Sequence, residues 1–136
     1  MRQKKFPKAL ANFKASRTIS EQLAKSDAGN VRWKRDLSVA HNKVGDVQLA
    51  LKQMDQALAS YRASLVIVEG LARIGTNNAR WQRDLWIGYW RLTKYQPKVY
   101  WPKVIAKLKV MDRQGILLPS DRKWIAVAIK RYAKVK

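Results

Sequence analysis

Hydrophobic residues recur along this chain at the spacing of one face of an α-helix. Apolar positions in residues 30–47 step alternately by four and three, and residues 78–95 repeat that spacing. The two stripes are Trp33, Leu37, Ala40, Val44 and Val47, and then Trp81, Leu85, Gly88, Leu92 and Tyr95. Asn30 and Asn78 precede them, and an asparagine side chain can accept hydrogen bonds from the first free N–H groups of a helix. The pattern predicts two equivalent amphipathic helices.

These helices belong to a longer internal repeat. When the chain is shifted by 48 positions, residues 10–47 align with 58–95, and fourteen of the 38 pairs are identical. Typical residue frequencies would give about two or three identities by chance. A further helical stripe precedes the second copy at Ala57, Leu58, Tyr61, Leu65, Val68, Leu71 and Ala72, and its counterpart is Leu10, Phe13, Ile19, Leu23 and Ala24. Each repeat is therefore predicted to be a helix, a short turn and a second helix.

Polar segments and prolines mark the expected breaks between helices. Residues 26–30 (SDAGN) and 75–78 (GTNN) predict loops, whereas the turn near 51–54 (LKQM) lacks Gly and Pro and is inferred from the change of stripe alone. Gln96 before Pro97 should end a helix, and Pro102 suits the first turn of the next. Ser120 or Asp121 is expected to cap a last helix, whose inner side carries Trp124.

We expect one all-α domain over residues 1–136. It would contain the second helix of a truncated repeat (5–29), a full repeat (30–75), the first helix of the next repeat (78–95) and a C-terminal helix pair (97–136). The partner of the first helix is missing from this scheme. Two alternatives follow: the chain is a fragment of a longer array, or its open N-terminal face pairs with another copy to form a homo-oligomer.

Residues 41–67 resemble a tetratricopeptide repeat (TPR). The residues that carry the resemblance are His41, Val44-Gly45, Ala57-Leu58, Tyr61 and Ser64, whereas the second copy has Thr93 in place of the small glycine. The usual period is about 34 residues, so a period of 48 implies longer helices. The resemblance implies a short right-handed α-solenoid of antiparallel helix pairs with a C-terminal capping pair. Gly45 and Ala57 would allow the two helices of a pair to approach closely.

The chain is strongly basic, with 29 Lys and Arg against nine Asp and Glu and a formal net charge of +20. Such a charge attracts polyanions and acidic protein surfaces. The absence of cysteine excludes disulfides, Cys-ligated zinc and thiol catalysis. No apolar run approaches the ~20 residues of a membrane span, and the basic residues 1–8 lead into no apolar signal core. A cytoplasmic location is expected.

The ionisable residues do not predict an enzyme. The single histidine, His41, aligns with Tyr89 beside a core stripe, so a packed role is favoured over metal binding or base catalysis. No two of the nine acidic residues are spaced i,i+3 or i,i+4, as an acid–base pair on one helix would need. The glycines form no phosphate-binding loop. We therefore expect no catalytic residue, no metal and no cofactor.

Two tryptophans offer a candidate binding site. Trp86 and Trp90 lie off the core stripe of the second copy, where the first copy has Ser38 and Asn42. In the TPR family the first helix of each pair lines a concave, peptide-binding groove. The resemblance thus implies a basic, aromatic groove wall made of Asn42, Lys43, Asp46, Arg83, Trp86, Trp90, Arg91 and Lys94. In the alternative, Trp86 and Trp90 pack beneath the C-terminal helix pair.

Three functions remain open at this point. The first is a non-catalytic protein–protein interaction scaffold that binds an acidic protein or peptide through the groove. The second is a nucleic-acid-associated protein that binds phosphates without sequence specificity, through the basic residues Lys98, Lys103, Lys107, Lys123, Lys130 and Lys134. The third is docking on anionic membrane surfaces.

Overall fold

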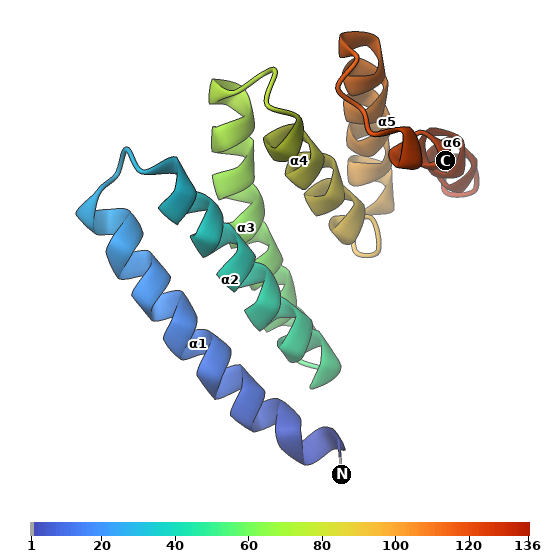
Figure 1. Ribbon diagram of the computed structural model, residues 1–136. Helices are drawn as coiled ribbons and strands as arrows, with labels where there is room; N and C mark the ends of the chain where they lie inside the picture. Colours follow the sequence, from blue (N-terminus) through green and yellow to red (C-terminus); the bar gives the residue numbers. More distant parts are fainter. Residues whose placement is uncertain (1) are drawn as a thin grey trace. The chain divides into compact units, whose positions relative to one another are not determined.

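The computed structural model describes residues 2–136, with side chains from Lys5 onward, and this part of the chain is helical without any β-strand. The elements are α1 (Arg2–Ser26), α2 (Val31–Ala50), α3 (Met54–Ile74), α4 (Ala79–Leu92), α5 (Pro97–Gln114), the short 3-10 helix η1 (Pro119–Asp121) and α6 (Lys123–Ala133) (Figure 1). The all-α prediction is confirmed. The turn inferred near 51–54 is also confirmed, because α2 ends at Ala50 and α3 begins at Met54.

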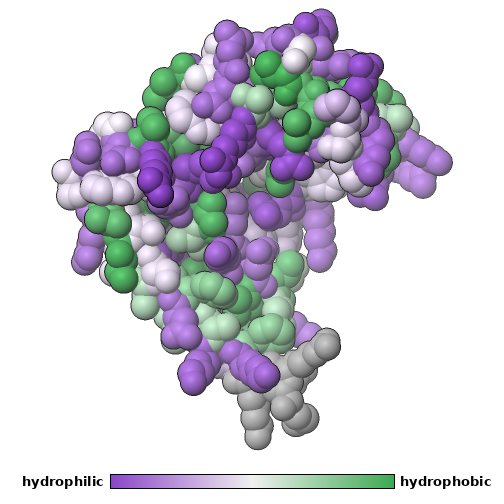
Figure 2. Space-filling model, viewed as in Figure 1, coloured by the Kyte–Doolittle hydropathy of each residue, from purple (hydrophilic) through white to green (hydrophobic). Residues whose placement is uncertain are grey.

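The helices form two compact units, Met1–Val68 and Glu69–Lys136, and α3 contributes its start to the first unit and its end to the second. In the first unit α1 packs against α2, and in the second α4 packs against α5 and α5 against α6. No helix within residues 2–136 combines the length and hydropathy needed to cross a membrane. The face drawn in Figure 2 is largely hydrophilic, with smaller hydrophobic areas between the polar side chains.

The two repeat copies begin their first helices in the same way. Asn30, with φ −80° and ψ 97°, accepts a hydrogen bond from the backbone N–H of Trp33 at 3.0 Å. Asn78, with φ −79° and ψ 101°, accepts the equivalent bond from Trp81 at 3.0 Å. Each asparagine satisfies a donor that the first turn of a helix would otherwise leave free. The predicted caps are confirmed.

A lysine in a left-handed conformation makes the turn between α2 and α3. Lys52 has a φ of 61°. Its N–H donates to the carbonyl of Leu49 at 3.0 Å, and the N–H of Gln53 donates to that of Gln48 at 2.8 Å. This bond pair is the Schellman ending of a helix, in which glycine usually takes the left-handed position. The sequence signal was weak because a residue with a Cβ stands there.

The C-terminal half differs from the predicted boundaries. Helix α4 ends at Leu92 rather than near residue 95, and α5 begins at Pro97, so that Pro102 lies inside the helix and not in its first turn. The prediction that Ser120 or Asp121 caps the last helix is wrong, because α6 has no side-chain cap. The carboxylate of Asp121 instead accepts a hydrogen bond from Nε of Arg83 at 2.8 Å.

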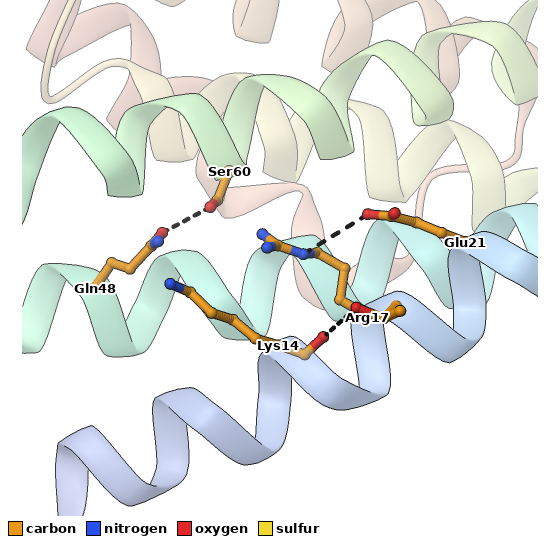
Figure 3. A network of polar contacts seen from close by, with 6 residues as sticks. Lys14, Arg17, Glu21, Gln48 and Ser60 are labelled. Atoms are coloured by element: carbon orange, nitrogen blue, oxygen red, sulfur yellow. Dashed lines mark hydrogen bonds and ion pairs between the residues drawn. The ribbon is translucent and has the colours of Figure 1, made fainter.

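Close approach of α2 and α3 organises the first unit. A Cβ on Gly45 would lie 2.7 Å from the ring of Tyr61, a distance that real Cβ contacts essentially never show. The hydroxyl of Tyr61 donates to Asp46 at 2.6 Å, and Ser60 donates to Gln48 at 2.7 Å, as Figure 3 shows for the second pair. Ala57 and Tyr61 are buried. Gly45 therefore provides the close contact that the sequence predicted.

Helix α1 is the least buried helix of the first unit. None of its described residues is fully buried, and Ile19 and Leu23 are 59% and 40% exposed. Their repeat counterparts on α3 are better covered, since Ile67 is half-buried and Leu71 is 2% exposed. An ion pair between Arg17 and Glu21, with Nε 3.8 Å from Oε1, lies on the same helix (Figure 3).

A buried glutamine joins three segments of the second unit. The side chain of Gln82, 2% exposed, donates from Nε2 to the carbonyls of Ala72 at 2.9 Å and Gly75 at 3.0 Å. Its Oε1 accepts a hydrogen bond from Nζ of Lys107 at 2.8 Å. Gln82 thereby connects α4 to the end of α3, to the following loop and to α5. Its repeat counterpart, Lys34, cannot accept such a bond.

We predict that Lys52→Gly stabilises the protein. Glycine removes the steric cost of the left-handed backbone, so the free energy of unfolding should rise by about 1 kcal/mol. Lys52→Ala is the matched control, because it removes the same charge but keeps a Cβ and should give no comparable gain. Urea denaturation followed by circular dichroism measures both. Equal effects of the two substitutions would contradict the backbone explanation.

We predict opposite effects for two alanine substitutions at helical glycines. Gly45→Ala should destabilise the chain by about 1–3 kcal/mol, because the new Cβ collides with the ring of Tyr61. Gly70→Ala meets only the end of Arg73, at 3.9 Å, and should be neutral or stabilising by up to about 1 kcal/mol. Thermal denaturation of the two variants checks the contrast. A Gly45→Ala protein as stable as the parent would refute the packing described for α2 and α3.

Candidate binding site

Four tryptophans from three helices meet in the second unit. Trp86 and Trp90 lie on α4, Trp101 on α5 and Trp124 on α6. The ring of Trp90 makes edge contacts with all the others, at centroid distances of 6.1 Å to Trp86, 4.8 Å to Trp101 and 5.5 Å to Trp124. We call this group the tryptophan cluster. Edge-to-face contacts of this kind stabilise by about 0.5–1.5 kcal/mol beyond the area that they bury.

Trp86 and Trp90 have different surroundings within the cluster. Trp86 is only 4% exposed, and Trp90, half-buried, contacts tryptophans of both C-terminal helices. Trp90 therefore packs against the C-terminal helices, and Trp86 is buried next to it on α4. The indole N–H of Trp86 has no hydrogen-bond partner among the described residues. Leaving such a buried donor unsatisfied costs about 1–3 kcal/mol.

A pocket nevertheless opens beside the cluster. It has a volume of about 470 Å³ and is lined by Trp86, Ile87, Trp90, Arg91, Trp124 and Arg131. Its walls come from α4 and α6 and are mainly apolar, with two guanidinium groups among the lining side chains. Pockets that bind small molecules commonly have volumes of about 300–1,000 Å³ and similarly apolar walls. We call it the tryptophan–arginine pocket.

Cations lie against the aromatic rings around this pocket. The guanidinium carbon of Arg131 is 5.4 Å from the ring centre of Trp90 and 5.9 Å from that of Trp101. The ammonium of Lys123 lies 5.1 Å from the ring of Trp124. Cation–π contacts contribute about 0.5–1 kcal/mol at exposed positions. The side chain of Arg131 is thus held over the cluster while the residue remains exposed to solvent.

The predicted site residues of α4 have different environments. Trp86, Trp90 and Arg91 line the pocket, whereas Lys94 follows the end of the helix and is exposed. Arg83 lies 5.9 Å from the ring of Trp86 and forms an ion pair with Asp121, whose side chain is almost fully buried. The hydrogen bond that Arg83 donates to the carboxylate of Asp121 raises the pKa of Arg83. Arg83 therefore serves first as a link from α4 to η1.

The other three predicted residues belong to the first unit. Lys43 lies over the ring of Phe13, with Nζ 5.9 Å from its centre. Asp46 accepts the hydrogen bond from Tyr61, and Asn42 is half-buried. None of these three lines the tryptophan–arginine pocket.

Sequence reasoning missed three residues of the pocket, namely Ile87, Trp124 and Arg131. The spacing of the last helix predicts a core position for Trp124, and it predicts no role for Arg131. A signal for Arg131 exists, because it follows Trp124 by seven positions and so shares its helix face. The spacing of residues within one helix does not tell which other helix its face will contact. The contact of the Trp124 and Arg131 face of α6 with α4 could therefore not be predicted.

An aromatic ring beside a glutamate recurs in both copies. In the second copy the hydroxyl of Tyr89 donates to Glu69 at 3.3 Å, and burial and then the charge of Glu69 raise the pKa of Tyr89 to about 12. In the first copy His41 and Glu21 occupy the equivalent positions. Burial lowers the pKa of His41, and the positive charge of Arg17 lowers it further, while Glu21 opposes both. His41 is therefore neutral at pH 7.

Within residues 2–136, no three histidine or carboxylate side chains lie close enough to hold a metal ion.

Comparison with known proteins finds no matching family model, no matching curated protein and no matching solved structure.

We predict that His41 makes the protein less stable in mild acid. Its pKa is lower in the folded chain than the ordinary 6.5, so the unfolded chain binds the proton more readily. Stability should therefore fall as the pH drops through 6.5 and continue to fall until the lowered pKa is reached. His41→Tyr, which copies the residue of the second repeat, should remove this part of the pH dependence. Urea denaturation at a series of pH values measures it, and parallel curves for both proteins would contradict the prediction.

Proposed function

We propose that this protein is a non-catalytic interaction scaffold of the TPR type that binds an acidic protein or peptide. The observation that carries the proposal is the tryptophan–arginine pocket, whose apolar walls and two arginines lie in a strongly basic unit. Residues 69–136 contain sixteen basic and four acidic residues, a net charge of +12. Tryptophan and arginine are also the residues most enriched among those that dominate protein–protein binding energies.

The TPR assignment is supported by the residues at which α2 and α3 meet. The family pairs a small residue on the first helix with a buried aromatic residue on the second, and here Gly45 lies against Tyr61. Ala57 and Ser64, at the other small positions, are both buried. On this proposal consecutive helices pair in an antiparallel manner, the pairs stack as a right-handed solenoid, and α5 with α6 form the C-terminal cap.

Binding of nucleic acid is the second candidate. It is favoured by exposed lysines on α5, on α6 and directly after α6, namely Lys98, Lys103, Lys109, Lys123, Lys130 and Lys134. Lysines of this kind contact phosphates and give an affinity that falls steeply with salt. Lys107, another lysine that the sequence suggests for phosphate binding, instead donates a hydrogen bond to the side chain of Gln82. Phosphate contacts do not use the apolar walls of the tryptophan–arginine pocket, whereas a protein or peptide can use them. The pocket therefore favours protein binding over nucleic-acid binding.

We predict that a labelled polyglutamate chain binds the protein through the pocket arginines. The double variant Arg91→Gln with Arg131→Gln should weaken this binding about tenfold, because two charges at the site are lost. The control is Lys43→Gln with Lys109→Gln, which removes two charges elsewhere, Lys43 being the repeat counterpart of Arg91. Fluorescence anisotropy at physiological salt measures both.

Single-stranded DNA of similar length serves as the competing probe. If DNA binds more tightly than polyglutamate and both double variants weaken it equally, the nucleic-acid function replaces the protein-binding one. If neither probe binds at low salt, both functions are wrong. Thermal melts of the variants establish that any loss of binding does not come from unfolding.

A further inference from the structure

We infer that the tryptophan–arginine pocket receives a single bulky apolar side chain from an acidic peptide, and that Arg131 binds a carboxylate next to that side chain. The inference rests on the proposed function, which requires only an acidic partner. It adds what the partner must contain: a residue such as phenylalanine or leucine, with aspartate or glutamate beside it.

The apolar part of the ligand follows from the walls of the pocket. Three of the six lining residues are tryptophans and a fourth is Ile87. A carboxylate placed against indole rings and an isoleucine would lose its hydration without gaining hydrogen bonds, which is unfavourable. An apolar side chain in the same place would gain free energy from every part of its surface that leaves water. A purely acidic segment therefore fits the charge of the unit but leaves the pocket unused.

The acidic part of the ligand follows from Arg131. Its guanidinium lies over Trp90 and Trp101 and belongs to an exposed residue at the pocket. A guanidinium that rests on aromatic rings keeps N–H donors at its edge, and these donors match the two oxygens of a carboxylate. Arg91 adds a second positive charge among the lining residues, which include no carboxylate. The ligand atoms nearest Arg131 should therefore be negatively charged.

The first repeat copy provides an internal comparison. At the positions of Trp86 and Trp90 it has Ser38, which is buried and donates its hydroxyl to the carbonyl of Arg35, and the polar Asn42. The helix start and its cap are the same in both copies, so the tryptophans are not needed to build the helix. Their addition makes the pocket a feature of the second unit, beyond what the repeat requires.

Three labelled peptides test the inference. The first has a central phenylalanine between two aspartates within an acidic sequence, the second replaces the phenylalanine with serine, and the third replaces every acid with its amide. We expect the first peptide to bind at least about tenfold more tightly than either of the others. Its advantage over the serine peptide should persist when the salt concentration is raised to about 0.5 M, because apolar burial is not screened.

Two variants connect the effect to the pocket. Ile87→Trp should fill the pocket and remove the advantage of phenylalanine over serine, whereas Val39→Trp, the same change at the repeat counterpart, should not. Arg131→Gln should reduce the advantage of the acidic peptide over its amide while the preference for phenylalanine over serine remains. If Ile87→Trp does not fold, the peptide series on the unchanged protein and on Arg131→Gln decides alone.

The outcomes separate this inference from the proposed function. Equal binding of the phenylalanine and serine peptides would overturn the inference but leave the proposed function standing. Failure of both acidic peptides and of polyglutamate would overturn both. If single-stranded DNA displaces the first peptide and itself loses affinity in Ile87→Trp, the occupant is a nucleic acid and the inference is wrong.

Discussion

Each amphipathic helix of this chain has an apolar face that it cannot bury alone, and the structure depends on neighbouring helices covering these faces. Where two helices lie close together, specific residues allow the close contact. Gly45 admits the ring of Tyr61, and the amide of Gln82 satisfies carbonyls at the end of α3 and in the loop that follows. On α1, which is less covered by neighbouring helices, large apolar residues such as Ile19 remain exposed.

The repeat shows how a binding site arises on a duplicated scaffold. Both copies have the asparagine cap, the apolar helical stripe and an aromatic ring next to a glutamate, because these features form the helices and position them. The differences lie at positions off the core stripe, where Ser38 and Asn42 correspond to Trp86 and Trp90. The ring of Trp90 contacts tryptophans of both C-terminal helices, and Trp86 and Trp90 line a pocket together with Trp124 and Arg131.

Charge acts on two scales in the second unit. The buried carboxylate of Asp121 is paired with Arg83 at short distance, which offsets the cost of removing a charge from water and holds η1 against α4. The remaining basic residues are mainly exposed and create a field that extends about 8–10 Å from the surface at physiological salt. This field attracts an acidic partner but does not choose among acidic partners, and the shape of the pocket supplies that choice in our proposal.

Features that depend on a few consecutive residues could be predicted from the amino-acid pattern alone. Helical stripes, the asparagine caps and the loops at 26–30 and 75–78 were predicted, because capping and periodicity act within one or two helical turns. The pattern did not reveal the conformation of Lys52, the start of α5 at Pro97 or the pairing of Asp121 with Arg83. The burial of Trp86 and the position of Arg131 at the pocket result from the packing of α4, α5 and α6. The physical reason is that these contacts join residues as far apart as 86 and 131, and their energies depend on which helix faces meet.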